Sequence, residues 1–352
     1  MTTLHTAKID NDRLALRLLS AVPLLLWEAC SETALILPYY HIVTDENVPH
    51  VKHLYGFRNT RQFGEDLDFF LGRYTPVGLS DIIAHLNGER NLARNSFHLT
   101  FDDGFREMYE VVAPILKDKG VPATFFLATA FIDNRSMAHH NQASVLVEHL
   151  AQDPDRTILG KVENLLDQNS IPGSNLFSRL TAIRYRDKAL VGEAAAICGC
   201  DLSGYMSSAS PYLTSEQIRS LLKQGFTIGA HSVDHPLYSE LPLADQISQT
   251  VESLHFLREH FPINHRAFAF PHGDRGVAPE FFETLRTSHH LDVSFGTDGL
   301  VKHFCPRNLE RFTLEKTPLS ARRVVAKQYP RAIYRNFFIS QEKSKPKKSF
   351  VH

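Results

Sequence analysis

The sequence has few cysteines and none of the patterns that mark a zinc ribbon or a disulfide scaffold. It contains 4 cysteines among 352 residues, and no two of them form a Cys-x-x-Cys pair. Small domains held together by structural zinc or by many disulfides carry cysteines at such spacings. We therefore expect free thiols and a protein that works in a reducing compartment.

Long apolar runs are also missing. An apolar stretch near the N-terminus, residues 14–30, is interrupted by Arg17, Pro23 and Glu28, and two aspartates precede it. A signal peptide has a basic start and an uninterrupted apolar core, and a membrane span needs about 20 apolar residues. We interpret residues 1–33 as an N-terminal helical extension, and we expect a cytoplasmic protein.

Neither sign of charge is in excess. The formal net charge is -1, with 43% hydrophobic and 22% charged residues. Proteins that bind nucleic acid usually carry a clustered positive excess, so no nucleic-acid partner is expected. The length and the apolar fraction suffice for one large core and are compatible with a single barrel-sized domain.

Buried strands and amphipathic helices alternate along most of the chain. Strands are expected at residues 34–43, 97–101, 123–128, 226–230, 266–270, 291–295 and 309–314. Helices are expected between them, as at residues 61–74, 106–119, 215–224 and 243–260. This βαβ rhythm predicts an α/β fold, a (β/α) barrel of seven or eight parallel strands over residues 34–340. In such barrels catalytic groups follow the C-terminal ends of the strands.

The rhythm breaks at residues 132–212, which are polar with helical patches. A segment of this length is too long for an ordinary loop, so we predict a helical insertion within the barrel domain, over the barrel mouth. It is either a lid that selects substrates or a lateral addition without a role in the reaction.

Basic residues gather near the C-terminus. They are Arg322, Arg323, Lys327, Arg331 and Arg335, interleaved with apolar and aromatic side chains. Such a segment is either a solvated helix or a peripheral contact with an anionic membrane surface. Residues 341–352, which include four lysines, are predicted to form a basic disordered tail.

Two adjacent carboxylates follow the predicted strand 97–101. The chain reads Thr100-Phe-Asp-Asp-Gly104 at this point. Two carboxylates at the end of a buried strand are costly unless their charge is neutralised, and a bound cation is the usual remedy. Gly104 lets the backbone turn sharply after them.

Two histidines complete a candidate metal site. His231 and His235 follow the predicted strand 226–230, and their spacing of four residues places both imidazoles on one side. Together with one carboxylate they form a ligand set for one divalent ion that leaves room for water and substrate. Zinc is the first choice, and cobalt, nickel, iron or manganese would also be acceptable. The alternative is that both histidines are structural.

These segments resemble a known family. Thr100-Phe-Asp-Asp-Gly104 and His231-Ser-Val-Asp-His-Pro236 resemble the first two motifs of the polysaccharide deacetylase (NodB-homology) family, carbohydrate esterase family four. Phe268-Ala-Phe-Pro-His-Gly273 is similar to the family's third loop. The resemblance covers about residues 34–130 and 212–314. It implies a distorted (β/α) barrel that hydrolyses an N-acyl group, usually acetyl, from an amino sugar.

The resemblance also implies roles for single residues. Asp102 would be the general base, and the backbone N–H of His272, with Gly273 beside it, would stabilise the oxyanion. The metal ligands would be Asp103, His231 and His235. A divalent ion held by one carboxylate and two neutral imidazoles keeps a positive charge, so it would lower the pKa of a water molecule and polarise the amide carbonyl.

The chain departs from the family's commonest pattern in two places. Classical members supply the proton for the leaving amine from a C-terminal Leu-x-His motif, where this chain has Leu309-Glu-Arg311. They also carry an arginine directly before the third loop, where this chain has Ala269; Arg266 lies on the other face of the strand. The sequence therefore predicts a site without the usual arginine and without the usual acid.

Another histidine must then supply the proton. The first candidate is His41, which ends the first predicted strand and could be protonated near neutral pH beside carboxylates. The alternative is that His41 only forms a hydrogen bond with Asp102 or the backbone. His272 is the second candidate, and His139 and His140 in the insertion are the third. Asp234 is expected to cap the turn that follows it.

The sequence thus predicts a metal-dependent carbohydrate N-deacetylase acting on a polysaccharide, an oligosaccharide or a lipid-linked precursor. One alternative is a deformylase of a lipid-linked formamido sugar, which would need the same site with a smaller acyl pocket. A second is a carbohydrate-binding protein with weak or no turnover, because the usual acid and arginine are missing. A metal-dependent phosphodiesterase would need a second cluster of ligands, which the sequence does not offer.

Overall fold

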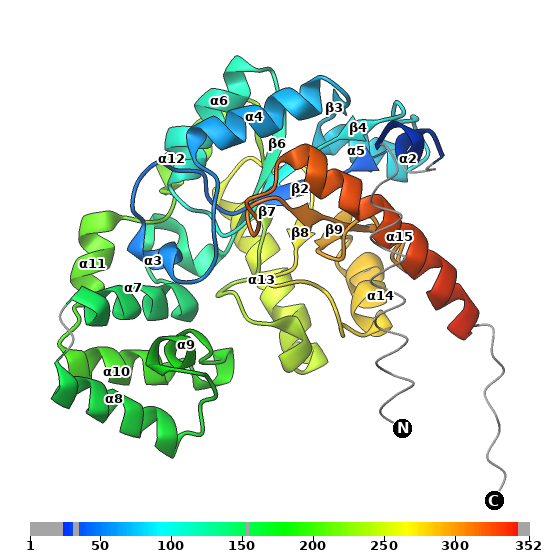
Figure 1. Cartoon of the computed structure of the whole chain (residues 1–352). Coiled ribbons are helices and arrows are strands. Elements are labelled where there is room, and N and C mark those ends of the chain that lie inside the picture. Colours follow the sequence, from blue (N-terminus) through cyan, green and yellow to red (C-terminus); the bar gives the residue numbers. More distant parts are fainter. Residues whose placement is uncertain (1–23, 31–34, 153–154, 344–352) are drawn as a thin grey trace, which may run out of the picture.

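Eight short parallel strands form a nearly closed barrel (Figure 1). The computed structural model describes residues 24–30, 35–152 and 155–343. The barrel strands are β2 (Pro38–Tyr40), β5 (Leu99–Phe101), β6 (Ala123–Leu127), β7 (Thr227–Ala230), β8 (Ala267–Ala269), β9 (Val293–Gly296), β10 (Asn308–Glu310) and β11 (Phe312–Thr313). They lie in the order β10-β9-β8-β7-β6-β5-β2-β11, and each neighbouring pair is parallel. The predicted barrel is therefore confirmed.

Three of the predicted strands are each divided in two. A second sheet contains β1 (Leu35–Ile36), β4 (Ser96–Phe97) and β3 (Thr75–Pro76), so the chain passes from this sheet into the barrel at Leu37 and again at His98. The imidazole of His98 joins the two sheets, since its ring nitrogens lie 2.8 Å from the Val77 carbonyl oxygen and 2.9 Å from the Thr124 hydroxyl. Burial lowers the pKa of His98 to about 4, so this bridge is neutral. The third division, between β10 and β11, falls at Arg311.

Helices surround the barrel. They are α2 (Leu24–Cys30), α3 (Pro49–Lys52), α4 (Thr60–Leu71), α5 (Leu79–Leu86), α6 (Ala113–Asp118), α12 (Ser215–Lys223), α13 (Leu243–His260), α14 (Pro279–Ser288) and α15 (Ala321–Lys343). The helix predicted over residues 106–119 is a π-helical turn, Met108–Val112, that continues into α6. Helix α12 begins at Ser215, as predicted. Thr214 caps it, because its side chain accepts a hydrogen bond from the backbone N–H of Gln217.

Aromatic side chains join these helices to the strands. Tyr40 of β2 lies 5.2 Å from Phe63 of α4 and 5.5 Å from Phe101 of β5, measured between ring centroids. Phe101 in turn lies 5.3 Å from Phe125 of β6. All four side chains are fully buried, so the strand ends that carry the site rest on a close-packed base.

The insertion forms a helical unit beside the barrel, at the lower left of Figure 1. Its helices are α7 (His139–Gln152), α8 (Arg156–Gln168), α9 (Leu176–Thr181), α10 (Ala189–Cys198) and α11 (Leu202–Ala209). They share an apolar core of their own, separate from that of the barrel.

Asp234 ties this unit to the barrel. It accepts hydrogen bonds from the Tyr185 hydroxyl and the Lys188 ammonium of the insertion and from Gln249 of α13. The prediction that Asp234 caps its own turn is therefore wrong, because its carboxylate oxygens are occupied by side chains far away in the sequence.

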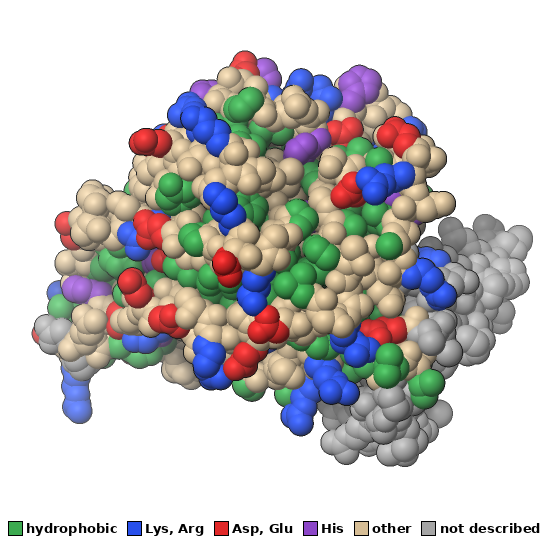
Figure 2. Space-filling view, turned by 90° about the horizontal axis from the view of Figure 1, so that it is seen from above, with side chains coloured by type: hydrophobic (Ala, Val, Ile, Leu, Met, Phe, Trp, Pro, Cys, Tyr) green, Lys and Arg blue, Asp and Glu red, His purple; other side chains and the backbone are tan. Residues whose placement is uncertain are grey.

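Helix α15 carries the basic C-terminal segment and extends to Lys343, three residues into the predicted tail. The rest of that tail and most of the N-terminal extension lie outside the described residues. Within the described part of the chain, no helix is both long and apolar enough to span a bilayer. Acidic and basic side chains are mixed over the face in Figure 2. Contact with a membrane stays a prediction.

Candidate active site

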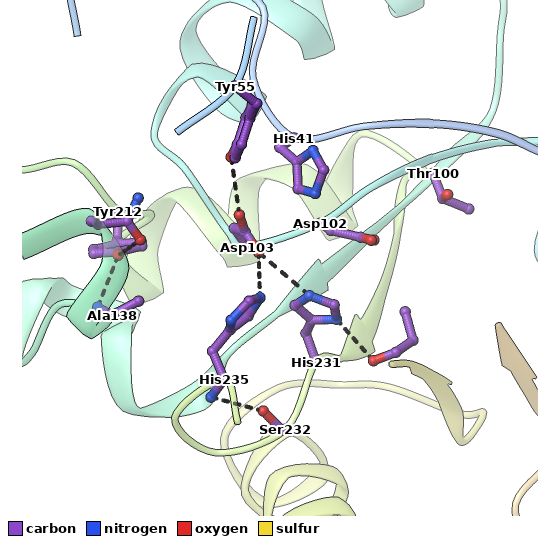
Figure 3. Close-up of polar contacts among 12 residues, drawn as sticks. His41, Tyr55, Thr100, Asp102, Asp103, Ala138, Tyr212, His231, Ser232 and His235 are labelled. Atoms are coloured by element: carbon purple, nitrogen blue, oxygen red, sulfur yellow. Dashed lines mark hydrogen bonds and ion pairs between the residues drawn. The ribbon is translucent and has the colours of Figure 1, made fainter. Parts of the chain in front are cut away.

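Asp102 and Asp103 lie in a tight turn directly after β5 (Figure 3). Their side chains are almost fully buried, with relative exposures of 2% and 5%. Asp103 and Gly104 both have backbone φ angles in the left-handed region, 77° and 79°. A side chain at Gly104 would also press on Leu127, since an added Cβ would lie 3.2 Å from its Cδ2. The glycine therefore permits the turn that separates the two carboxylates.

Asp103 faces two histidines that follow β7. The Nε2 atoms of His231 and His235 lie 3.4 Å and 3.0 Å from its Oδ1. The Nδ1–H of His231 donates to the Ala269 carbonyl oxygen at 2.8 Å, so Nε2 presents its lone pair toward Asp103. Carbonyl groups orient metal-binding imidazoles in this way.

The three side chains fit a divalent cation. Oδ1 of Asp103 is buried and has no hydrogen-bond donor within the described residues. One potential ligand atom from each of Asp103, His231 and His235 lies within 4.8 Å of the other two. An oxygen and two nitrogens in this arrangement are a donor set that zinc and similar ions accept.

Backbone strain is concentrated at the same place. Besides Asp103, His235 and His272 have positive φ angles, 65° and 59°. L-residues other than glycine adopt this region rarely and at a cost, so the surrounding fold must impose it. Each of these residues turns its side chain toward one cavity of about 210 Å³.

Asp102 faces away from this group toward Arg311. The guanidinium donates from Nη1 to Oδ1 at 2.7 Å and from Nη2 to Oδ2 at 2.8 Å. Arg311 is fully buried, and Nη1 also donates to the Thr100 hydroxyl. Burial alone would raise the pKa of Asp102, but Arg311 outweighs it and holds that pKa below its usual value. Asp102 is thus ionised at neutral pH.

Ala269 stands at the position of the usual arginine, as predicted, but Arg311 from another element pairs with Asp102, which was not predicted. Arg311 occupies the single position between β10 and β11, where its side chain crosses to the turn after β5. It is 209 residues from Asp102 along the chain, so local spacing could not reveal the pair. The available signal was a charged residue inside an apolar strand pattern.

His41 forms a second pair with a carboxylate that the sequence did not reveal. Its Nδ1–H donates to Oε2 of Glu315 at 2.7 Å, and its backbone N–H donates to Oε1 of the same carboxylate at 2.7 Å. Burial would lower the pKa of His41, but Glu315 outweighs it, so the net direction is upward. His41 lines the cavity with Asp102 and Asp103.

The other candidate acids have shifts in the opposite direction. Desolvation and neighbouring histidines lower the pKa of His140 and of His272 well below the usual value. Desolvation lowers the pKa of His139 to about 4. These imidazoles are therefore unprotonated at neutral pH, and only His41 of the four has a raised pKa.

A model of the family described as Polysaccharide deacetylase matches residues 89–281, more than half of the chain. The chain belongs to the polysaccharide deacetylase family. No curated protein sequence matches this deacetylase family member.

Solved deacetylase structures share the fold. The deacetylase PplD of Streptococcus pyogenes, solved with acetate, has a TM-score of 0.55 at 14% identity, over 85% of this chain and 99% of that one. IcaB of Ammonifex degensii has 0.51 at 18%, over 84% and 97%. The polysaccharide deacetylase BC0361 of Bacillus cereus has 0.51 at 12%, over 84% and 69%. These likenesses support the distorted barrel.

In this family member the insertion reaches the cavity from the side. His140 of α7 and Thr181 of α9 both line it. The His140 ring lies 4.9 Å from that of His235 and 5.6 Å from that of His272, between centroids. The insertion therefore supplies part of the cavity wall.

Proposed function

We propose that this member of the family is a metal-dependent hydrolase that removes an N-acetyl group from an amino sugar. The observation that carries the proposal is the division between the two carboxylates. Asp103 faces His231 and His235 with an oxygen that lacks a donor, whereas both oxygens of Asp102 are paired with Arg311. Metal-assisted hydrolysis of an amide uses such a pairing of a cation site with a separate, ionised base.

The metal ligands would be Asp103, His231 and His235, with zinc as the first choice. A divalent cation there would polarise the scissile carbonyl and lower the pKa of an attacking water. Asp102 takes the proton of that water: its lowered pKa keeps it ionised, and a carboxylate keeps free lone pairs beside a bidentate arginine. His272 lines the same cavity. Its backbone N–H, with Gly273 beside it, is proposed to receive the developing oxyanion.

His41 supplies the proton for the leaving amine. Because Nδ1 is held by Glu315, the proton is delivered from Nε2. The C–N bond then breaks, and acetate and the free amino sugar leave. The proton on Asp102 then returns to solvent and His41 takes up a proton from solvent, which restores both groups.

One of the two alternatives loses its basis, and the other still needs a test. The binding-protein alternative was based on a missing arginine and a missing acid. Arg311 beside Asp102 and His41 beside Glu315 provide candidates for both, so that argument no longer holds. Deformylation needs the same groups, so the released acid decides between the two reactions.

The test is a screen for released acetate and formate by metal-loaded protein over N-acetylated oligosaccharides, lipid-linked N-acetylated sugars and their N-formyl counterparts. The proposal expects acetate, lost on chelation and restored by added zinc. Formate alone would establish the deformylase. Release of neither acid by protein shown to contain one metal ion would overturn the proposal.

A further inference from the structure

A second cavity opens beside the catalytic one. Its volume is about 590 Å³. It shares Tyr39, Thr297 and Lys316 with the catalytic cavity, so the two cavities adjoin. A substrate whose acetyl group lies at Asp102 could therefore extend into this space.

One face of α15 forms a wall of this cavity. Val324, Lys327, Gln328 and Arg331 line it, and they follow the i, i+3, i+4, i+7 spacing of one helical face. Arg322 and Arg323 of the same helix are exposed but do not line the cavity. Lys316 of the segment after β11 and Arg275 of the segment after β8 provide the remaining cations.

The charge of the lining is strongly positive. Its four cations, Arg275, Lys316, Lys327 and Arg331, accompany one carboxylate, Asp298. Arg275 donates to Asp298 at 2.7 Å, which neutralises that pair. Lys316, Lys327 and Arg331 form no ion pair with any carboxylate of the described residues, and all three are exposed. Three uncompensated cations around one cavity contrast with the net charge of -1 of the whole chain.

We propose that this cationic cavity binds a phosphate or diphosphate group on the amino-sugar substrate. The inference rests on the proposed function and adds the substrate class to it. A neutral polysaccharide would bring no negative charge to these three cations, whereas a phosphoryl group offers several acceptor oxygens and more than one negative charge. Lysine and arginine side chains are the usual partners of such groups.

The first test measures binding of inorganic phosphate to the full-length, metal-loaded protein by titration calorimetry. The cavity variant is Lys327→Gln with Arg331→Gln, and the control is Arg322→Gln with Arg323→Gln, which changes the net charge equally on the same helix. We expect saturable binding that weakens at least tenfold in the cavity variant and less than twofold in the control. No saturable binding by the unaltered protein, or equal loss in both variants, would overturn the proposal.

The second test compares acetate release from N-acetylglucosamine 1-phosphate and from N-acetylglucosamine. The ratio of their kcat/KM values should fall at least tenfold in the cavity variant and stay unchanged in the control. A ratio that does not fall would contradict the proposal. If neither sugar is hydrolysed by the unaltered protein, the proposed function loses support, and the phosphate titration still decides the present inference.

The source of the phosphate is distinguished by competitors. Dodecyl phosphate represents a lipid-linked sugar and uridine monophosphate represents a nucleotide-linked one. The stronger competitor with inorganic phosphate identifies the source, and failure of both to compete would contradict a site for substrate phosphates.

Discussion

Asp102 and Asp103 are consecutive, almost fully buried and chemically identical, yet their surroundings differ. Asp103 meets two imidazoles that follow β7 and keeps an oxygen without a donor. Asp102 is held by the buried guanidinium of Arg311, from between β10 and β11. The comparison teaches that neighbouring side chains determine what each carboxylate can do. The surroundings of Asp103 suit a bound cation, and those of Asp102 keep it ionised as a base.

The largest effect on the rate should come from replacing Asp103. Replacing Asp103 with Ala removes a ligand, so we expect loss of the metal and a fall in acetate release of at least about 1,000-fold. Metal analysis and a rate assay on the same preparation measure both. The exchange Asp155→Ala, at an exposed carboxylate of the insertion, should change neither. Full metal content in the Asp103 variant would contradict the ligand assignment.

Removing the partner of Asp102 should change the stability of the protein and the pH dependence of its rate. Arg311→Met leaves a buried carboxylate without its partner, which should lower the free energy of unfolding by about 3–5 kcal/mol. Without the guanidinium the pKa of Asp102 rises, so the acidic limb of the rate profile moves to higher pH. Denaturant unfolding and pH–rate profiles measure these changes.

A double variant measures how much of this stability comes from the interaction between Asp102 and Arg311. Asp102→Asn combined with Arg311→Met removes both charges, so it should recover part of the lost stability. A double variant that loses at least as much stability as the two single variants together would show that Asp102 and Arg311 do not stabilise each other.

His41 should show a pH effect of the opposite direction. Glu315→Gln removes the carboxylate that raises the pKa of His41, so the basic limb of the rate profile should move to lower pH. The Glu310→Gln variant serves as control, because Glu310 bonds Asp298 and Asn308 and not His41. An unmoved basic limb in the Glu315 variant would exclude His41 as the acid.

The smallest effect concerns Glu310 itself. Burial and the neighbouring Asp274 raise its pKa from 4.5 to about 8. The folded chain therefore keeps a proton that the unfolded chain loses, and stability falls as the pH rises through this range. Glu310→Gln cannot lose a proton, so its melting temperature should fall about 2–4 °C less than that of the unaltered protein between about pH 6 and pH 9. An equal fall in both proteins would contradict the raised pKa.

Local signals predicted the barrel and the residues around Asp103. The strands end in short motifs, and each motif places its side chains at the mouth because parallel strands share a direction. His231 and His235 could be paired with the Asp-Asp-Gly turn for this reason alone.

The partners of Asp102 and His41 could not be predicted in the same way. Arg311 is 209 residues from Asp102, and Glu315 is 274 residues from His41. Both contacts form only when β11 pairs with β2 and brings the end of the barrel back to its start. Their sequence neighbours carry no repeat or spacing that reports this closure.

The variant Asp102→Asn tests the central claim most directly, with metal content and acetate release measured on one preparation. The division of roles predicts one metal ion per chain and a rate reduced about 100- to 10,000-fold, because the ligands remain and the base is lost. Loss of the metal, or an unchanged rate with the metal bound, would contradict it.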